Sequence, residues 1–279
     1  QEVQRALDAA HPLPDIPLRM TAYVLEEAPA EKSRVVVAAD VDIRALDFQE
    51  VDGRFTDTLE YLLAVVHRDT NEYFRVDEKA DMKLLPETRD KLAVTWYPIV
   101  RDFELPPGPY RAKIVVRDRA NGQLGTVTHD FEVEGFDRWR VTTPILSETV
   151  DRGEDGQSRP RAVPSARRVY VPGEPLYLEF QVIGAARDPS TGLPRVASGH
   201  SLQDGRGATL FVAEPTPIRP SSTGTVSRLI GLATAGLAPG DYALTLFLQD
   251  RVSGEMIEVL EPFRLAPSGG PAPAASSGG

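Results

Sequence analysis

The feature that most constrains this 279-residue sequence is an internal repeat. The stretch LPPGPYRAKIVVRDRANGQLGTVTHDFEV, which begins at residue 105, recurs as LAPGDYALTLFLQDRVSGEMIEVLEPFRL, which begins at residue 237. Seven positions keep their residue type at a constant offset of 132, without insertion: Leu105 and Leu237, Pro107 and Pro239, Gly108 and Gly240, Tyr110 and Tyr242, Asp118 and Asp250, Gly122 and Gly254, Phe131 and Phe263. Because an unbroken offset indicates one structural unit used twice, the sequence predicts two domains of the same type.

Each copy of the repeat predicts a β-hairpin. In residues 110–117 and 242–249 apolar side chains occupy every second position, which is typical of a strand with one buried face. Asn121-Gly122 and Ser253-Gly254 follow, where glycine supplies the positive φ of a tight turn. A second alternating stretch comes after each turn, so each domain is expected to end in a hairpin.

The opening Leu-x-Pro-Gly-x-Tyr of each copy resembles the tyrosine corner of immunoglobulin-like and fibronectin type III sandwiches. In that motif a tyrosine at the start of the penultimate strand bonds through its hydroxyl to backbone just upstream, while the leucine fills the core. The resemblance implies structural corners made by Leu105, Gly108 and Tyr110 and by Leu237, Gly240 and Tyr242. An ordinary turn followed by a core tyrosine is the alternative.

Length and pattern favour an all-β fold with two tandem immunoglobulin-like β-sandwich domains and a short N-terminal helix. Two domains of about 120 residues are large enough to bury a core each. We expect residues 1–14 to form the helix and a linker, 15–135 the first sandwich, 136–266 the second and 267–279 a disordered tail. The helix is expected because Val3, Ala6, Leu7 and Ala10 make one apolar stripe.

Further elements are predicted from alternation and turn residues. A helical turn is expected at 86–89 and a mobile polar loop at 151–166. The remaining strands are expected at 18–26, 34–42, 59–67, 73–76 and 93–104 in the first domain, and at 169–171, 175–183, 208–213 and 226–234 in the second. The strand at 59–67 is apolar on both faces and should be the most buried of its domain.

Composition excludes several classes of function. The sequence has no cysteine, which excludes thiolate catalysis and cysteine-ligated metal sites. The formal charge of −10 argues against a general nucleic-acid-binding protein, which needs clustered Lys and Arg. No stretch has the roughly 20 apolar residues of a transmembrane helix. Because the sequence begins with Gln1, we expect a processed or excised piece of a longer protein.

Signals for catalysis, cofactors and metals are weak, so we predict no catalytic, cofactor-binding or metal site and no enzyme. The histidines His11, His67, His129 and His200 are scattered without a ligand-pair spacing. Ser198-Gly199-His200-Ser201 lacks the context of a nucleophile elbow. Two acidic groups, Asp40 with Asp42 and Asp77 with Glu78 and Asp81, could hold Ca²⁺, but solvated charge is favoured because neither has a known calcium-site spacing.

Four segments carry a family resemblance: IPLRMTAYVLEE, DGRFTDTLEYLLAVVHR, MKLLPETRDKLAVTWYP and ELPPGPYRAKIVVRD. Together they resemble the C-terminal region of VWFA-related domain proteins, secreted bacterial proteins abundant in acidobacteria, over residues 1–266. The resemblance implies an upstream von Willebrand factor A domain and a secreted, periplasmic or cell-surface location. The Asp-x-Ser-x-Ser metal motif of that domain has no match here, since residues 188–192 lack the final serine, and no metal ligand is carried over.

Three functions from different classes remain open. A non-enzymatic structural or protein-interaction region of a secreted or envelope protein explains both the repeat and the lack of catalytic motifs. An accessory carbohydrate- or polymer-binding module of a larger hydrolase is the alternative, although no row of aromatics can be assembled from the sequence. An enzyme with an unrecognised site would need a perturbed carboxylate cluster in a deep pocket.

A candidate interaction face comes from comparing the outer sides of the two equivalent strands. The first strand is expected to expose a charged surface of Arg111, Lys113, Val115 and Arg117. The second presents Ala243, Thr245, Phe247 and Gln249 at the same offset. Charge depletion around a retained aromatic is typical of an interface core, so this face is predicted to contact another domain or a protein partner. Coverage by the 151–166 loop or by the first domain is the alternative.

Overall fold

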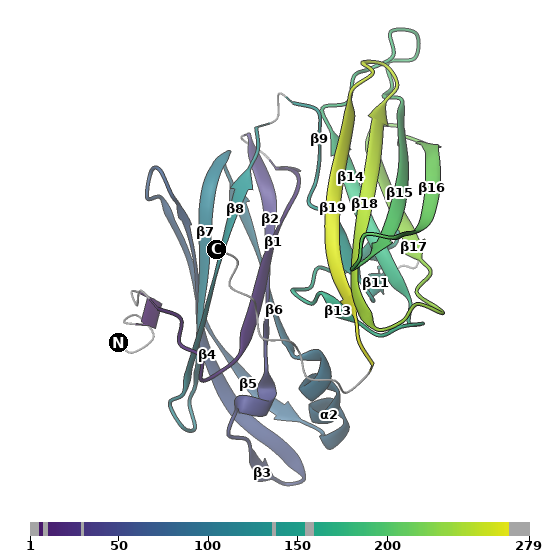
Figure 1. Ribbon diagram of the computed structural model, residues 1–279. Coiled ribbons are helices and arrows are strands. Elements are labelled where there is room, and N and C mark those ends of the chain that lie inside the picture. Colours follow the sequence, from purple (N-terminus) through teal and green to yellow (C-terminus); the bar gives the residue numbers. More distant parts are fainter. Residues whose placement is uncertain (1–5, 8–10, 29–30, 136–137, 154–158, 268–279) are drawn as a thin grey trace. The chain divides into compact units, whose positions relative to one another are not determined.

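The structure, a computed structural model, describes residues 6–7, 11–28, 31–135, 138–153 and 159–267 (Figure 1). The chain divides into two compact units. Among the described residues, unit 1 comprises 6–7, 11–22 and 32–134, and unit 2 comprises 23–28, 31, 135, 138–153 and 159–267. The main border therefore lies one residue from the 135/136 border expected from the sequence, whereas the assignment of Tyr23–Glu31 to unit 2 was not expected.

Unit 1 is built from two antiparallel sheets (Figure 1). One has the order β1-β2-β6, and the other has the order β3-β4-β7-β8 with β5 also paired to β4. The residues of β1 from Tyr23 onward are grouped with unit 2. The strands are β1 (Leu18–Ala28), β2 (Lys32–Val41), β3 (Gln49–Val51), β4 (Arg54–His67), β5 (Tyr73–Leu84), β6 (Tyr97–Leu105), β7 (Gly108–Asp118) and β8 (Leu124–Val133). The unit also contains a 3₁₀ turn, η1 (Ile43–Ala45), and the helix α2 (Pro86–Thr95).

Unit 2 repeats this architecture. One sheet has the order β10-β14-β17 with β9 also paired to β14, and the other has the order β13-β19-β18-β15-β16. The strands are β9 (Arg140–Val141), β10 (Ile145–Ser147), β11 (Val150–Asp151), β12 (Arg161–Ala162), β13 (Val169–Tyr170), β14 (Leu176–Ile183), β15 (Val196–Asp204), β16 (Thr209–Ile218), β17 (Val226–Leu232), β18 (Gly240–Asp250) and β19 (Met256–Leu265). β11 and β12 form a separate two-stranded sheet.

Seven strands of unit 1 correspond to seven strands of unit 2 in their order within the sheets. The series β5-β4-β7-β8 in unit 1 matches β16-β15-β18-β19 in unit 2, and β1-β2-β6 matches β10-β14-β17. Within each unit the apolar faces of the two sheets supply the core, which in unit 2 contains Leu178, Phe180, Leu244 and Leu246. The predicted all-β class with two immunoglobulin-like sandwiches is confirmed.

The tyrosine of each repeat copy starts the equivalent strand and is buried. The hydroxyl of Tyr110 donates to the carbonyl of Pro106 (2.8 Å), and that of Tyr242 donates to the carbonyl of Ala238 (2.6 Å). Each ring stacks on the phenylalanine of the neighbouring strand. The ring centroids are 5.5 Å apart for Tyr110 and Phe131, and 5.6 Å apart for Tyr242 and Phe263. The corner leucines differ, because Leu105 is fully buried whereas Leu237 is only partly buried.

The two corner glycines also differ in whether a residue with a side chain could replace them. Gly108 has φ +147°, and a Cβ there would lie 2.2 Å from Nε2 of His67. The His67 ring cannot move away easily, because its Nδ1 accepts from the backbone of Asp69 (3.2 Å) and the ring lies edge-on to Tyr110. Gly240 has nothing within 4 Å of an added Cβ. Only the first corner therefore depends on glycine.

A buried aspartate closes the hairpin of each repeat copy. Asp118 and Asp250 are both fully buried, and each accepts a backbone N–H two residues ahead, from Ala120 (2.7 Å) and Val252 (2.8 Å). The second carboxylate oxygen accepts a distant N–H, that of Asp47 in unit 1 and that of Ala186 in unit 2. These aspartates anchor a loop from elsewhere in the same unit to the hairpin.

Several sequence predictions need correction. The helical turn at 86–89 extends to Thr95, so the strand predicted to begin at residue 93 begins at Tyr97. Trp96 ends the helix with φ +70°. The 151–166 segment is not wholly a mobile loop, since Asp151 pairs with Arg161 and Ala162 is buried. β15, the central strand that contains Ser198 and His200, was not predicted at all.

The ends of the chain fall largely outside the described residues. Of the predicted N-terminal helix only Ala6 and Leu7 are described, and both are helical. The predicted disordered tail at 267–279 lies outside the described residues except for its first position.

Candidate interaction surface

The four residues predicted as an interaction face lie on the outer side of β18. Ala243, Thr245, Phe247 and Gln249 are all partly exposed, and they alternate with buried residues that point into the core of unit 2. Phe247 is half-buried rather than enclosed within its own unit. The alternation along β18 therefore leaves one apolar aromatic accessible in the middle of the sheet.

Neighbouring strands extend this face with apolar side chains. On β19, Leu260 lies opposite Thr245 and Met256 opposite Gln249, with 60% and 65% of their surface exposed. On β16, Val212 lies opposite Ser201, which in turn lies opposite Thr245. Leu260, Thr245, Ser201 and Val212 thus occupy matching positions on four adjacent strands, with Ser201 buried between the other positions. Figure 1 shows the four strands, β19, β18, β15 and β16. We call Phe247, Leu260, Met256 and Val212 the apolar face.

Charge is sparse on the apolar face. Glu258 lies opposite Phe247 and is the one charged residue among the β19 partners of the outward-facing residues Ala243, Thr245, Phe247 and Gln249. An exposed ion pair between Arg264 and Asp241 (3.4 Å) lies at the end of the same side. An apolar surface bordered by charged residues has the composition of an interface core with a polar rim.

The equivalent side of unit 1 is covered, which contradicts the expectation that Val115 faces water. Val115 and its cross-strand neighbours Leu62 and Thr126 are buried. The N-terminal segment lies against these strands: Nζ of Lys113 donates to the carbonyl of Leu7 (2.6 Å). The prediction was wrong because it considered only the strand itself, whereas a remote part of the chain covers it.

The N-terminal segment also occupies the free edge of β8. The backbone N–H of Thr126 donates to the carbonyl of Leu13 (3.0 Å), and Pro14 forms a bridge with Gly125. A Cβ on Gly125 would lie 2.2 Å from the carbonyl oxygen of Ile16, so this close approach requires glycine. In unit 2, by contrast, Leu260, Met256 and Val212 of the apolar face remain more than half exposed.

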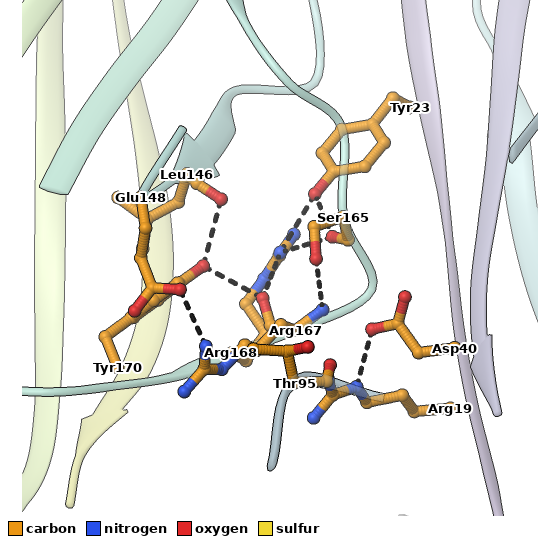
Figure 2. A network of polar contacts seen from close by, with 10 residues as sticks. All are labelled: Arg19, Tyr23, Asp40, Thr95, Leu146, Glu148, Ser165, Arg167, Arg168 and Tyr170. Atoms are coloured by element: carbon orange, nitrogen blue, oxygen red, sulfur yellow. Dashed lines mark hydrogen bonds and ion pairs between the residues drawn. The ribbon is translucent and has the colours of Figure 1, made fainter. Parts of the chain in front are cut away.

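Unit 2 contains a buried polar cluster that the sequence did not indicate (Figure 2). The hydroxyl of Tyr23 donates to the carbonyl of Ser165 (2.7 Å) and accepts from Nη1 of Arg168 (2.9 Å). The hydroxyl of Tyr170 lies within hydrogen-bonding distance of the carbonyls of Leu146 (2.9 Å) and Arg167 (2.8 Å). These contacts attach the Tyr23–Glu31 segment to unit 2 and explain why it belongs there.

A glutamate faces this cluster from the core side of β19. Glu261 is 9% exposed and lies opposite the core residue Leu244. Burial raises the pKa of Glu261 to about 7, and the nearby positive charge of Arg168 opposes this shift only in part. Burial also raises the pKa of Tyr23, again against the influence of Arg168. The only sequence signal for this buried glutamate was the presence of an acidic residue at a core-facing position of β19.

The acidic residues considered for Ca²⁺ are instead bonded to neighbouring side chains. Asp40 pairs with Arg19 (2.7 Å), and Asp42 accepts from Nη2 of Arg44 (2.5 Å). On β5, Asp77 pairs with Arg75, Glu78 contacts Arg101 and the hydroxyl of Tyr61, and Asp81 accepts from Thr58. Within the described ranges, no group of three or more His, Cys, Asp or Glu residues could hold a metal ion.

One carboxyl group of unit 1 has a strongly shifted pKa. Burial, with smaller contributions from Asp118 and Asp47, raises the pKa of Asp57 to about 6. Asp57 lines a hollow of about 520 Å³ together with Asp81, Lys83 and Arg119. Neither Ser198 nor any of the four histidines is among the residues that line this hollow.

The serine and histidines considered for catalysis lie in structural environments. Ser198 is buried in β15, and its hydroxyl accepts from Nη1 of Arg228 (2.8 Å). The ring of His200 packs against Phe211 at 5.5 Å, and burial lowers the pKa of His200. His67 supports the first corner, and His129 stacks on Phe131.

Comparisons with known proteins do not identify a family. No family model matches the sequence, and no curated protein matches it. Among solved structures, the chain is similar to the trypsin-activated alpha-2-macroglobulin of Escherichia coli, at 9% identity and a TM-score of 0.25. The match covers 92% of this chain and 17% of that chain. A likeness of this strength carries no functional argument, and the fold assignment rests on the sheets described above. No helix in the described parts of the chain is long and apolar enough to span a membrane.

Proposed function

We propose that this chain is a non-enzymatic structural and protein-interaction region of a secreted or cell-envelope protein, and that unit 2 binds a protein partner through its apolar face. The proposal rests on a difference in solvent exposure between the outer sides of the equivalent sheets in the two units. In unit 1 the N-terminal segment lies against the outer side, and Val115 is buried. In unit 2 Leu260, Met256 and Val212 remain more than half exposed around Phe247.

The proposed partner has an apolar contact surface. The side chains that lie opposite one another across β18 and β19 offer mostly hydrocarbon, with Glu258 as the nearest charge. Burying exposed apolar area contributes roughly 25 cal/mol per Å² before the costs of association, so a short apolar segment can bind here. The proposal is supported by unit 1, where Nζ of Lys113 on the equivalent side donates to the carbonyl of Leu7 and Ala6 is buried.

The secreted or envelope setting, with a von Willebrand factor A domain upstream, is proposed from the sequence resemblance alone. The alternative function, a carbohydrate- or polymer-binding module, needs a planar row of exposed aromatic rings. Among the described residues the largely exposed aromatics are Tyr73 in unit 1 and Phe211 in unit 2, which do not make a row within either unit. This observation favours protein binding over polysaccharide binding.

The test compares partner capture by the full chain and two aspartate variants. Leu260→Asp places a charge on the apolar face, whereas the control, Val94→Asp, places one at a similarly exposed valine in α2 of unit 1. We expect proteins of the envelope and secreted fractions that bind the wild-type chain to be retained by Val94→Asp and lost from Leu260→Asp. Identical capture by all three chains, or retention on insoluble polysaccharide with competition by the soluble form, would show that the proposal is wrong.

A further inference from the structure

Three arginines of unit 2 line one hollow of about 360 Å³ beside β17, the strand at the end of its sheet (Figure 1). They are Arg159, Arg219 and Arg228, and no Asp or Glu is found among the described residues that line the same hollow. Positive charge is thus concentrated here although the whole chain has a formal charge of −10. Sites for small molecules commonly have volumes of roughly 300–1,000 Å³, so this one can hold a small ligand. We call it the arginine hollow.

Arg228 is a charged residue in an otherwise apolar row of β17. It lies opposite the buried Phe180, and the other residues on that side of the strand, Val226, Ile230 and Leu232, belong to the core or pack against it. A charged group at such a position costs desolvation free energy unless polar groups surround it. The hydrogen bonds of Arg228 therefore indicate how this position tolerates a charge.

Among the described residues, all hydrogen-bond acceptors of the Arg228 side chain are neutral. Its Nη1 donates to the hydroxyl oxygens of Ser198 (2.8 Å) and Thr216 (3.0 Å), and its Nη2 donates to the carbonyl of Pro217 (3.1 Å). Burial lowers the pKa of Arg228, but a guanidinium group stays protonated at neutral pH. These acceptors hold the guanidinium group in place without cancelling its charge.

The other two arginines keep an uncompensated charge as well. Arg159 donates from Nη1 to the hydroxyl of Ser227 (2.7 Å) and from Nη2 to the carbonyl of the same residue (2.7 Å). This pair of bonds fixes the guanidinium group of Arg159 against β17. Arg219 is exposed, and within the described ranges its side chain has neither a hydrogen bond nor an ion pair. Two guanidinium groups are therefore positioned by neutral groups, and the third is not committed to another part of the protein.

Three guanidinium groups at one site favour a ligand with several acceptor oxygens and a high negative charge. Guanidinium groups bind carboxylate and phosphate through parallel pairs of N–H···O bonds. A phosphate monoester has three acceptor oxygens and a charge of roughly −1.5 to −2 at pH 7, whereas a carboxylate has two oxygens and a single charge. Phosphate therefore matches three arginines better than carboxylate does. Pro160 and Leu229 line the same hollow and offer hydrocarbon to the rest of a ligand.

We propose that the arginine hollow binds a small phosphate monoester whose phosphate group contacts the three arginines. The organic part of this ligand packs against Pro160 and Leu229. The arginine hollow shares no residue with the apolar face, so the proposal goes beyond the proposed function and does not depend on it.

The test is an NMR titration of the full chain at pH 7 with phenyl phosphate, at an ionic strength held constant with sodium chloride. We expect saturable shifts of the side-chain N–H signals of the three arginines, with a Kd on the order of 1 mM. Inorganic phosphate, which lacks the ring, should bind about fivefold more weakly because it buries no apolar area. Phenylacetate, which keeps the ring but has a carboxylate, should bind about tenfold more weakly.

Each ligand can overturn part of the proposal. Without saturable shifts for phenyl phosphate, the arginine hollow is not a binding site. Equal affinity for phenylacetate would contradict the assignment to phosphate, and equal affinity for inorganic phosphate would contradict the apolar contact.

Matched glutamine variants separate a specific site from general attraction to positive charge. Arg219→Gln removes a side chain without bonds in the described part of the chain, so the fold should be retained, and phenyl phosphate should bind about fivefold more weakly. The control is Arg206→Gln, which removes the same charge at an exposed arginine of unit 2 outside the arginine hollow and should bind as the wild type does. Unchanged binding by Arg219→Gln, or equal weakening in both variants, overturns the proposal.

The apolar-face variant separates this proposal from the proposed function. Leu260→Asp should bind phenyl phosphate as the wild type does, whether or not it loses a protein partner. If folded Leu260→Asp loses phenyl phosphate binding and Arg219→Gln retains it, the ligand binds at the apolar face, and the proposal for the arginine hollow is wrong.

Discussion

The outer sides of β7 in unit 1 and β18 in unit 2 occupy the same place in the same architecture, yet their surroundings differ. The side of β7 includes Val115, which is buried and lies close to the chain's own N-terminal segment. The side of β18 includes Phe247, which stays half-buried between exposed apolar residues. Duplication of a domain therefore does not duplicate its surface, because a segment outside the repeat determines which face is covered. This difference is the basis of the interaction that we propose for unit 2.

The edges of the two units show the same divergence. β5 has charged residues through most of its length, and several are bonded to side chains of neighbouring strands. β16 has hydrocarbon at the same place in the sheet order. Edge protection is a property of side chains rather than of topology, so identical strand orders can give one closed and one open edge.

The largest effect is expected from removing the corner tyrosines. Tyr110→Ala and Tyr242→Ala should each reduce the free energy of unfolding by about 3–5 kcal/mol, because each leaves a large cavity beside a stacked phenylalanine. Tyr110→Phe and Tyr242→Phe should each reduce the free energy of unfolding by about 1 kcal/mol, because each loses one hydrogen bond to the backbone. Denaturant unfolding followed by circular dichroism measures both.

The exposed Tyr73 provides a control for the corner tyrosines, and Tyr73→Ala should change stability by less than about 0.5 kcal/mol. A similarly small change for Tyr110→Ala or Tyr242→Ala would mean that the two corners do not support their units in the same way. Unequal effects would show which unit depends more on its corner.

A pH-dependent effect is expected in unit 2 and has no counterpart in unit 1, where the position equivalent to Glu261 is His129. Burial raises the pKa of Glu261 from its ordinary value of 4.5 to about 7. The folded state therefore binds the proton more tightly than the unfolded state, and stability falls as the pH rises from about 4.5 to about 7.

Glu261→Gln should remove this loss. At pH 8 the variant is expected to be more stable than the wild type by on the order of 2 kcal/mol, and at pH 4 the two should be nearly equal. Thermal unfolding across this pH range provides the measurement. A constant difference between variant and wild type at all pH values would show that ionisation of Glu261 is not responsible.

A further difference in stability is expected between variants at the two corner glycines. Gly108→Ala should cost about 1–3 kcal/mol, because φ +147° is strained for alanine and the new methyl group would contact the His67 ring. Gly240→Ala should change stability by less than about 0.5 kcal/mol, since an added Cβ meets nothing within 4 Å. Equal losses at the two positions, measured by thermal unfolding, would contradict the structural difference between the corners.

Local pattern was sufficient for much of the fold. The alternation in β2, β4, β7 and β18 and the glycine turns predicted strands and hairpins, because each depends on residues close in sequence. β15 escaped prediction since VASGHSLQD has small and polar residues where apolar alternation was expected. Its Ser198 is nevertheless buried and bonded to Arg228, a partner thirty positions away.

By itself, the sequence determined the repeated domain type, the two tyrosine corners and the charge difference between β7 and β18. The tertiary structure decided which of these surfaces is accessible, because burial of Val115 depends on contacts between segments more than 100 residues apart. The tertiary structure also decided the pKa of Glu261, which rises because the rest of unit 2 removes the carboxyl group from water. Periodicity reports which side of a strand a residue lies on, whereas solvent exposure and charge state depend on what the whole chain places against that side.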